Sequence, residues 1–288
     1  MGARAEVHGP GSVSVAEQIR LAALLGDGVR SPSGAERSAL RGWTAVDLNG
    51  HVQGFIVDDD ERPGVGREGE WVATSPAVLA ALYTAAAAEW TRRSIWTHTT
   101  VLRRNDPLEG TLLSLGFGHE QAYGELQVAH VDRPATVRVR LLSTEEHDRV
   151  LPLVGVIAES QAGSPAFAPR TAEFLDALDS SFLEWASRDV VVFCCFDSTG
   201  RDPVGFLAVD GSEDVPEITL AAVAPTARGQ GIGSSLLSAA RGWALTAGIP
   251  TLQVDWRTTN PLADAFWSSA GVETTAYRWS RTIDARPS

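Results

Sequence analysis

Lysine is absent from this chain, because all 24 of its basic residues are arginine. That absence excludes a lysine Schiff base, and it excludes the phosphate-binding loop that ends in lysine. Cysteine is almost absent as well. The two cysteines, Cys194 and Cys195, are neighbours in the sequence, so they cannot form a disulfide framework. A chain without a disulfide framework is expected in the cytoplasm.

The chain also lacks long apolar runs and a basic surface. No stretch approaches the roughly 18 apolar residues of a membrane span, so we expect no membrane partner. The formal net charge is −12, and residues 1–133 carry 12 arginines against 17 acids while residues 134–288 carry 12 against 19. Neither half is a basic module, so we expect no nucleic-acid partner. The histidines show no metal-ligand spacing, so we expect no metal.

The predicted strands and helices follow one another in a similar order in the two halves of the chain. The length of 288 residues is typical of two domains. Each half also carries an asparagine followed eleven residues later by a glycine, at Asn105 to Gly116 and at Asn260 to Gly271. This weak internal repeat predicts two domains, residues 1–133 and 134–288. The fold class that follows is α/β (α+β), with two tandem domains that each have a mixed, mostly antiparallel central sheet flanked by helices.

Hydrophobic periodicity and turn residues predict the individual elements. Asn49-Gly50 between two apolar runs indicates a hairpin, and Ser143 followed by Glu146 is typical of a capping box that opens a helix. In the first half the predicted strands are 43–48, 53–57, 71–73, 95–102 and 124–131, with helices at 76–93 and 105–116. In the second half the predicted strands are 136–142, 190–196, 203–210, 217–223, 251–255 and 274–283, with further helices at 171–186, 232–247 and 260–270.

The most informative segment joins a strand to a helix through glycines at alternate positions, Arg228-Gly-Gln-Gly-Ile-Gly233. Glycine lets a backbone approach a ligand closely and adopt positive φ. The N–H groups at a helix N-terminus favour an anion, and a pyrophosphate fits that description. The guanidinium of Arg228 can hold phosphate oxygens.

A dinucleotide-binding fold is a competing interpretation of this segment. Gly229, Gly231 and Ser234 occupy the places of G-x-G-x-x-G, and Asp255 ends the next strand. Against it, residues 224–228 separate the glycines from the strand. Too few strand–helix units follow for a doubly wound sheet, and the preceding strands are hairpin-like.

The segment resembles the GCN5-related N-acetyltransferase (GNAT) family, whose signature takes the form R-G-x-G-x-G. The stretch from Asn260 to Gly271, Asn-Pro-Leu-Ala-Asp-Ala-Phe-Trp-Ser-Ser-Ala-Gly, is similar to the family's downstream N-x-x-A-x-x-F-Y-x-x-x-G segment. The resemblance implies binding of acetyl-CoA and transfer of its acetyl group to an amine, which we expect to be a small molecule. The coenzyme-binding residues that it implies are Val223, Arg228, Gly229, Gln230, Gly231, Ile232, Gly233, Ser234, Asn260 and Trp267.

Glu217 matches the position where some members of the family carry a catalytic base, although a solvated strand end would equally explain it. A carboxylate can remove the ammonium proton directly or through water. Nearby, Asp210 and the acids at 213 and 214 could attract a cationic amine, or they could simply be a charged hairpin loop. Trp267 stands where the family usually has a tyrosine, and this departure puts the general acid in doubt. A non-catalytic acyl-CoA sensor or scaffold is therefore an alternative.

The first half resembles the family only in the order of its elements. It has no glycine loop where one is due, and Leu112 stands at the place that corresponds to Trp267. We interpret it as a degenerate copy, in a layout like that of the mycothiol synthases. The sequence leaves open whether the protein is a monomer or a homodimer.

Overall fold

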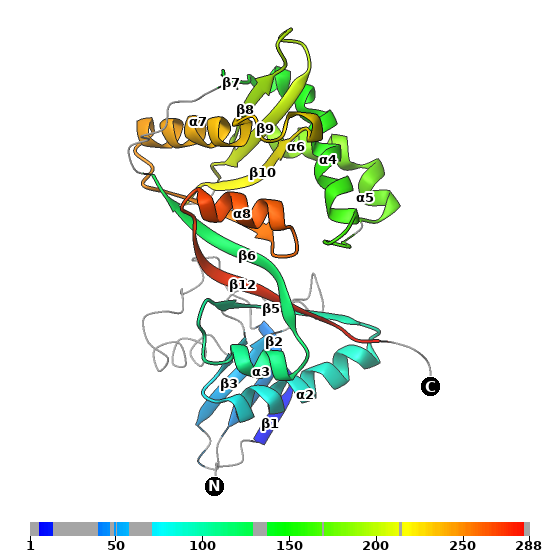
Figure 1. Cartoon of the computed structure of the whole chain (residues 1–288). Coiled ribbons are helices and arrows are strands. Elements are labelled where there is room, and N and C mark those ends of the chain that lie inside the picture. Colours follow the sequence, from blue (N-terminus) through cyan, green and yellow to red (C-terminus); the bar gives the residue numbers. More distant parts are fainter. Residues whose placement is uncertain are drawn as a thin grey trace. The chain divides into compact units, whose positions relative to one another are not determined.

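The computed structural model describes residues 6–13, 40–46, 49, 51–57, 71–128, 137–168, 170–212 and 215–284 (Figure 1). The boundary predicted at residue 133 lies outside these residues, as do the acids at 213 and 214.

Packing divides the chain into two compact units. Unit 1 comprises Met1–Gln121 and Ala276–Ser288, and unit 2 comprises Ala122–Thr275. Both division points fall inside a strand, the first in β6 (Gly118–Gln127) and the second in β12 (Glu273–Thr282). By packing, the end of β12 belongs with unit 1, whereas the boundary at 133 grouped it with the second half. That boundary stays a prediction.

Unit 1 opens with four strands that form a sheet in the order β1-β2-β3-β4. The predicted hairpin is confirmed, because β2 and β3 pair antiparallel on either side of Asn49. Strand β1 was not predicted, since its Gly-Pro-Gly sequence is unfavourable in strands. The elements of unit 1 before β6 are β1 (Glu6–Val13), β2 (Leu40–Val46), β3 (Val52–Val57), β4 (Trp71–Ala73), α2 (Pro76–Arg92), β5 (Thr97–Arg103) and α3 (Glu109–Ser114).

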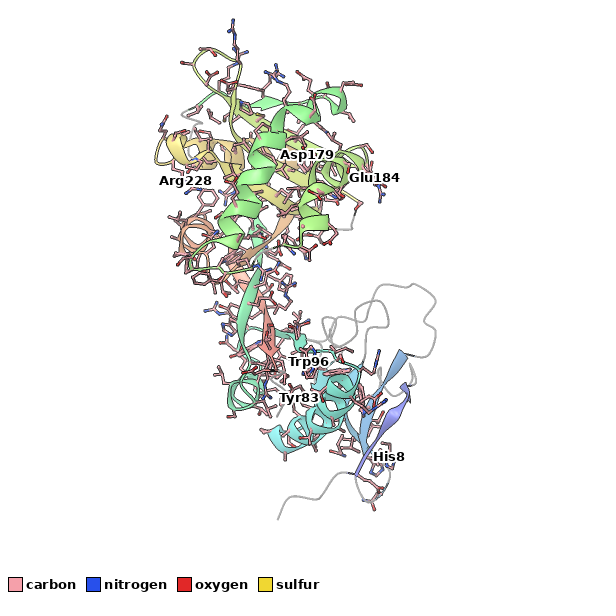
Figure 2. All side chains as sticks on the ribbon, turned by 90° about the vertical axis from the view of Figure 1, so that its right-hand side faces the viewer. His8, Tyr83, Trp96, Asp179, Glu184 and Arg228 are labelled. Atoms are coloured by element: carbon pink, nitrogen blue, oxygen red, sulfur yellow. The ribbon has the colours of Figure 1, made fainter. Side chains whose placement is uncertain are left out.

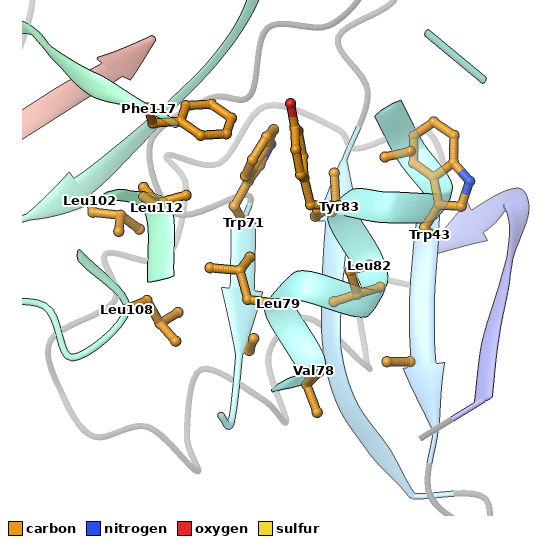
Figure 3. Close-up of a cluster of buried hydrophobic side chains, with 14 of the residues drawn as sticks. Trp43, Trp71, Val78, Leu79, Leu82, Tyr83, Leu102, Leu108, Leu112 and Phe117 are labelled. Atoms are coloured by element: carbon orange, nitrogen blue, oxygen red, sulfur yellow. The ribbon is translucent and has the colours of Figure 1, made fainter. Parts of the chain in front are cut away.

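Aromatic side chains fill much of the core of unit 1 (Figure 3). Trp71 stacks on Trp90 with ring centroids 5.7 Å apart. Trp279 of β12 belongs to the same cluster and is only 1% exposed. Strand β12 pairs antiparallel with β5 from Ala276 to Thr282. The last strand of the chain therefore completes both the core and the sheet of unit 1.

Unit 2 contains the remaining elements. They are β7 (Arg140–Leu141), the 3-10 helix η1 (Thr144–Val150), α4 (Leu151–Ala162), α5 (Ala172–Asp176), α6 (Leu178–Ala186), β8 (Val190–Phe196), β9 (Pro203–Asp210), β10 (Glu217–Val223), η2 (Pro225–Ala227), α7 (Ile232–Thr246), β11 (Thr251–Arg257) and α8 (Pro261–Ser269). The second sheet has the order β5-β12-β6-β11-β10-β9-β8-β7. Strands β7 to β10 pair antiparallel with one another, and β10 pairs parallel with β11. The predicted fold class is confirmed.

In unit 2, helices cover both faces of strands β8 to β10. Figure 1 shows α4 and α6 on one face and α7 on the other. Phe182 of α6 meets Phe206 of β9 edge-on, with ring centroids 6.3 Å apart. The helix predicted at 171–186 is divided at Ala177. The short α5 buries no residue, whereas α6 turns Phe182 and Ala186 into the core.

Both units contain a strand glycine against which a helix packs closely, and this shared feature supports the internal repeat. A Cβ added at Gly205 of β9 would lie 2.5 Å from Cγ2 of Ile232, the first residue of α7. A Cβ added at Gly54 of β3 would lie 2.9 Å from Cγ1 of Val78, in the first turn of α2. In each unit a strand glycine thus lets the following helix dock closely on the sheet.

Candidate active site

Gly231 forms the N-terminus of α7. It is the N-cap residue and has a φ of 76°, in the left-handed region that favours glycine. No side chain caps the helix, and no acid lies in its first turn. The first amides of a helix have no acceptor within the helix. This end of α7 is therefore suited to an anion.

The turn that leads into α7 is open to solvent. Arg228, Gly229, Gln230 and Gly231 are all exposed. A Cβ added at Gly229 would meet no other atom within 4 Å, so no described side chain fills the turn. The exposed amides and the exposed guanidinium leave room for a ligand with several phosphate oxygens.

The last glycine of the motif has a different surrounding. A Cβ added at Gly233 would lie 3.1 Å from the ring of Phe266, so this glycine lets α8 pack against the first turn of α7. Ile232 is buried against β9, while Ser234 is exposed. The predicted binding residues of the motif therefore fall into two groups. Residues 228–231 form an exposed turn, whereas Ile232 and Gly233 pack against neighbouring elements.

Strands β10 and β11 separate beside this turn. They pair at Glu217↔Gln253 and Ile218↔Val254 only, although both strands are described in full. The pairing of β10 with β9 shifts register between Ile218 and Leu220 and then continues to Val223. The backbone of Val223 thus has a strand neighbour on one side and none from β11 on the other. Strand β10 is thus irregular beside β9 and separated from β11 over its second half.

Helix α8 accounts for two further predicted residues. The side-chain oxygen of Asn260 accepts a hydrogen bond from the N–H of Ala263 at 3.2 Å and so caps the helix. Trp267 is only 5% exposed and meets Phe266 edge-on. Leu112, which corresponds to it in unit 1, is fully buried. Position 267 is thus a core position in this fold, and its role in coenzyme binding stays a prediction.

Glu217 begins β10 and is half-buried. It stands opposite Asp210 of β9 and Gln253 of β11 in the register of the sheet. It lies at the end of β10 where the two strands are still paired, just before they separate.

The two cysteines lie inside β8, and both are fully buried. Burial raises the pKa of the Cys194 thiol to about 12 and that of the Cys195 thiol to about 11. Because the thiolate is the nucleophile, neither side chain is suited to chemistry near neutral pH.

We expect a thiol reagent such as Ellman's reagent to modify neither cysteine in the folded protein at pH 8. Both should react once the protein is denatured, because unfolding removes the burial that keeps the thiols protonated. Absorbance of the released reagent measures both reactions. Rapid reaction of the folded protein would contradict the burial of β8.

Two kinds of feature are absent from the described part of the chain. No group of three or more His, Cys, Asp or Glu side chains in it could hold a metal ion. None of its helices has the length and apolarity required to cross a membrane.

Comparison with known proteins identifies the family of this part of the chain. Residues 160–272, which include the turn and all of β8 to α8 around it, match the acetyltransferase (GNAT) family. The chain thus contains a GNAT-family domain, which supports an acyltransferase. The predicted resemblance is confirmed over these residues. No curated protein sequence matches this chain.

Solved structures show the same fold over the whole length. A tandem GNAT protein from the clavulanic acid biosynthesis pathway is 14% identical, with a TM-score of 0.54 over 99% of this chain and 100% of that chain. A GNAT-family acetyltransferase from Colwellia psychrerythraea is 13% identical, with a TM-score of 0.53 over 97% and 100%. A GCN5-related N-acetyltransferase from Sphaerobacter thermophilus is 13% identical, with a TM-score of 0.56 over 87% and 83%. These structures share the fold of this chain, and one of them is a tandem GNAT protein.

Proposed function

We propose that unit 2 transfers an acetyl group from acetyl-CoA to the amine of a small molecule by direct attack. The exposed turn at residues 228–231, which leads into an uncapped α7 beside separating strands, is the observation that carries the proposal. The amides of this turn and of the first turn of α7 would bind the pyrophosphate. Arg228 would add its guanidinium, and the backbone of Val223 would orient the pantetheine arm or the acetyl carbonyl.

Unit 1 differs from unit 2 at the equivalent helix. Ser75 caps α2 with its own side chain, which accepts a hydrogen bond from the N–H of Val78 at 3.4 Å. Trp71–Ala73 leads to this cap through Thr74 alone, without a glycine turn. The end of α2 that would face a phosphate is thus already hydrogen-bonded. This contrast favours unit 2 as the coenzyme-binding unit.

The reaction needs one group to accept a proton. The acceptor arrives as an ammonium ion, loses one proton, and attacks the thioester carbonyl through its nitrogen. The C–N bond forms, the C–S bond breaks, and the nitrogen gives up a second proton. One of the two protons ends on the coenzyme A sulfur and the other in solvent. Glu217 would take the first, directly or through water.

The departing sulfur does not require a dedicated acid. A free thiol has a pKa of about 8.5, so a thiolate can leave without full protonation. The replacement of the usual tyrosine by the buried Trp267 is therefore compatible with catalysis. Asn260 would use its amide N–H groups toward the pantetheine or a water, since its oxygen caps α8.

Release of free thiol from acetyl-CoA in the presence of a panel of amines tests the proposed function. We expect release that depends on the amine, with binding of acetyl-CoA detectable by calorimetry. Tight binding without turnover on any amine would favour the sensor. Preference for NAD over coenzyme A would support the dinucleotide interpretation.

Replacing Glu217 with glutamine is expected to lower kcat about 10- to 100-fold at pH 7. This is at or below the lower end of what a positioned base contributes, because water can also accept the proton. The loss should shrink as pH rises toward the amine pKa near 10, where free amine becomes plentiful. A pH–rate profile measures this. Glu173→Gln, an exposed change on α5, is the control. An equal loss at every pH would remove Glu217 as the base.

A further inference from the structure

We propose that Asp210 acts with Glu217 to bind the ammonium group of the acceptor, and that the acceptor is an aliphatic cationic amine with no carboxylate. The inference rests on the proposed function of unit 2. Asp210 would be a specificity-determining residue, which selects the acceptor by its charge.

The register of the sheet places the two carboxylates on one face. Asp210 of β9 stands directly opposite Glu217 of β10, before the register shift that begins at Ile218. Opposite residues of antiparallel strands point to the same face, with Cβ atoms about 4.5–5.5 Å apart. Phe206 and Ala208 precede Asp210 at alternate positions, and both belong to the core under α4 and α6. Both carboxylates thus face the α4/α6 side.

Hydrogen bonds fix the Asp210 side chain in place. The indole N–H of Trp185 on α6 donates to Oδ2 at 2.8 Å, and the backbone N–H of Ser212 donates to Oδ1 at 2.9 Å. Burial acts to raise the pKa of Asp210, but the hydrogen bonds from Ser212 and Trp185, together with the charge of Arg188, outweigh it and hold the pKa below its usual value. Asp210 is therefore a fixed negative charge at neutral pH.

Charges of both signs lie near this pair in the described part of the chain. Arg188 is shared with Glu184, which it contacts at 3.3 Å. On β11, Asp255 and Arg257 alternate with Gln253, the neighbour of Glu217, and so belong to the same face with opposite charges. Helix α4, which packs on β10, carries a single charged residue, and it is another acid, Glu159.

Two like charges directly opposite on neighbouring strands destabilise a sheet. An ammonium ion between them would relieve this repulsion, while a carboxylate on the acceptor would add to it. The pair includes the proposed base, Glu217, and it lies at the paired end of β10 and β11, just before the two strands separate. The geometry therefore favours an alkyl mono- or diamine over an amino acid.

Three acceptors of one chain length test the charge preference: 1,4-diaminobutane, 1-aminobutane and 4-aminobutanoate. With the whole protein and acetyl-CoA, we expect kcat/KM to fall in that order, by about tenfold or more from the diamine to the amino acid. Use of 4-aminobutanoate as well as the diamine would overturn the inference. Thiol release with none of the three would count against the proposed function instead.

Asp210→Asn tests the residue itself, because asparagine has the size of aspartate without its charge, and its amide oxygen can still accept one of the two hydrogen bonds. We expect KM for 1,4-diaminobutane to rise about tenfold, while KM for acetyl-CoA and for 4-aminobutanoate stays within about twofold. Asp179→Asn, which removes one exposed charge from α6 (Figure 2), is the matched control and should change none of these values. A similar rise for diamine and amino acid would show a merely structural role and overturn the inference.

Two further measurements keep the inference testable if turnover or folding fails. Butyltrimethylammonium cannot be acetylated, so calorimetry reports its binding without catalysis. We expect about tenfold weaker binding to Asp210→Asn than to the unmodified protein, and equal binding would overturn the inference. Should Asp210→Asn fail to fold, Trp185→Phe removes the hydrogen bond that orients Asp210. It should raise KM for the diamine alone, and an unchanged KM would overturn the inference.

Discussion

Replacing Gly231 with tryptophan is expected to weaken acetyl-CoA binding about 10²–10⁴-fold, which corresponds to losing two charge-assisted hydrogen bonds at about 1.5–3 kcal/mol each. A large side chain at the N-cap of α7 would occupy the space in front of the amides that receive the pyrophosphate. Calorimetric titration with acetyl-CoA measures the loss. Unchanged affinity would contradict the proposed site.

A matched control separates this effect from backbone strain. Gly248 lies beyond the opposite end of α7 with a φ of 74°, and a Cβ added there would meet nothing within 4 Å. Gly248→Trp thus introduces the same side chain at the same kind of backbone conformation, with a similar strain of about 1–2 kcal/mol. It should lower the melting temperature about as much as Gly231→Trp does, and it should leave acetyl-CoA affinity unchanged.

Replacing Trp279 with alanine is expected to destabilise unit 1 by about 3–5 kcal/mol, as for other buried aromatic residues. The side chain is 1% exposed, and its indole N–H has no hydrogen-bond partner, so the loss is one of packing. Urea denaturation measures the free energy of unfolding. Hydrogen exchange should show lost protection in β5, the strand that pairs with β12.

Trp96→Ala is the control for this change, because Trp96 also belongs to unit 1 but is 37% exposed. Trp96→Ala should lower the free energy of unfolding far less than Trp279→Ala does. Loss of protection confined to β8–β10 in Trp279→Ala, with β5 unaffected, would contradict the place of β12 in unit 1.

The sequence predicted the local part of this fold well because the signals are local. The strands at 190–196, 203–210 and 217–223 appear at the predicted residues, since apolar runs bounded by turns define them. The helix that follows Gly231 was equally clear, because glycines end the preceding turn and an amphipathic run begins at Ile232. The exposed part of the candidate site followed from these two signals.

What the sequence could not show depends on residues far apart in the chain. That β12 pairs with β5, and that Asp210 stands opposite Glu217, are consequences of strand pairing, which leaves no local signal. Trp267 was aligned by motif position, but its burial depends on how α8 packs on the sheet. The close approach of Gly54 to Val78, equivalent to that of Gly205 to Ile232, could be recognised only in three dimensions.

The place of β12 also has a consequence for the order in which the protein can fold during synthesis. A chain made from its N-terminus usually folds its first domain first. Here all residues of unit 2 precede residue 276, whereas unit 1 needs Ala276–Thr282 for its sheet and Trp279 for its core. The unit whose synthesis begins first is therefore the last that can be completed on the ribosome.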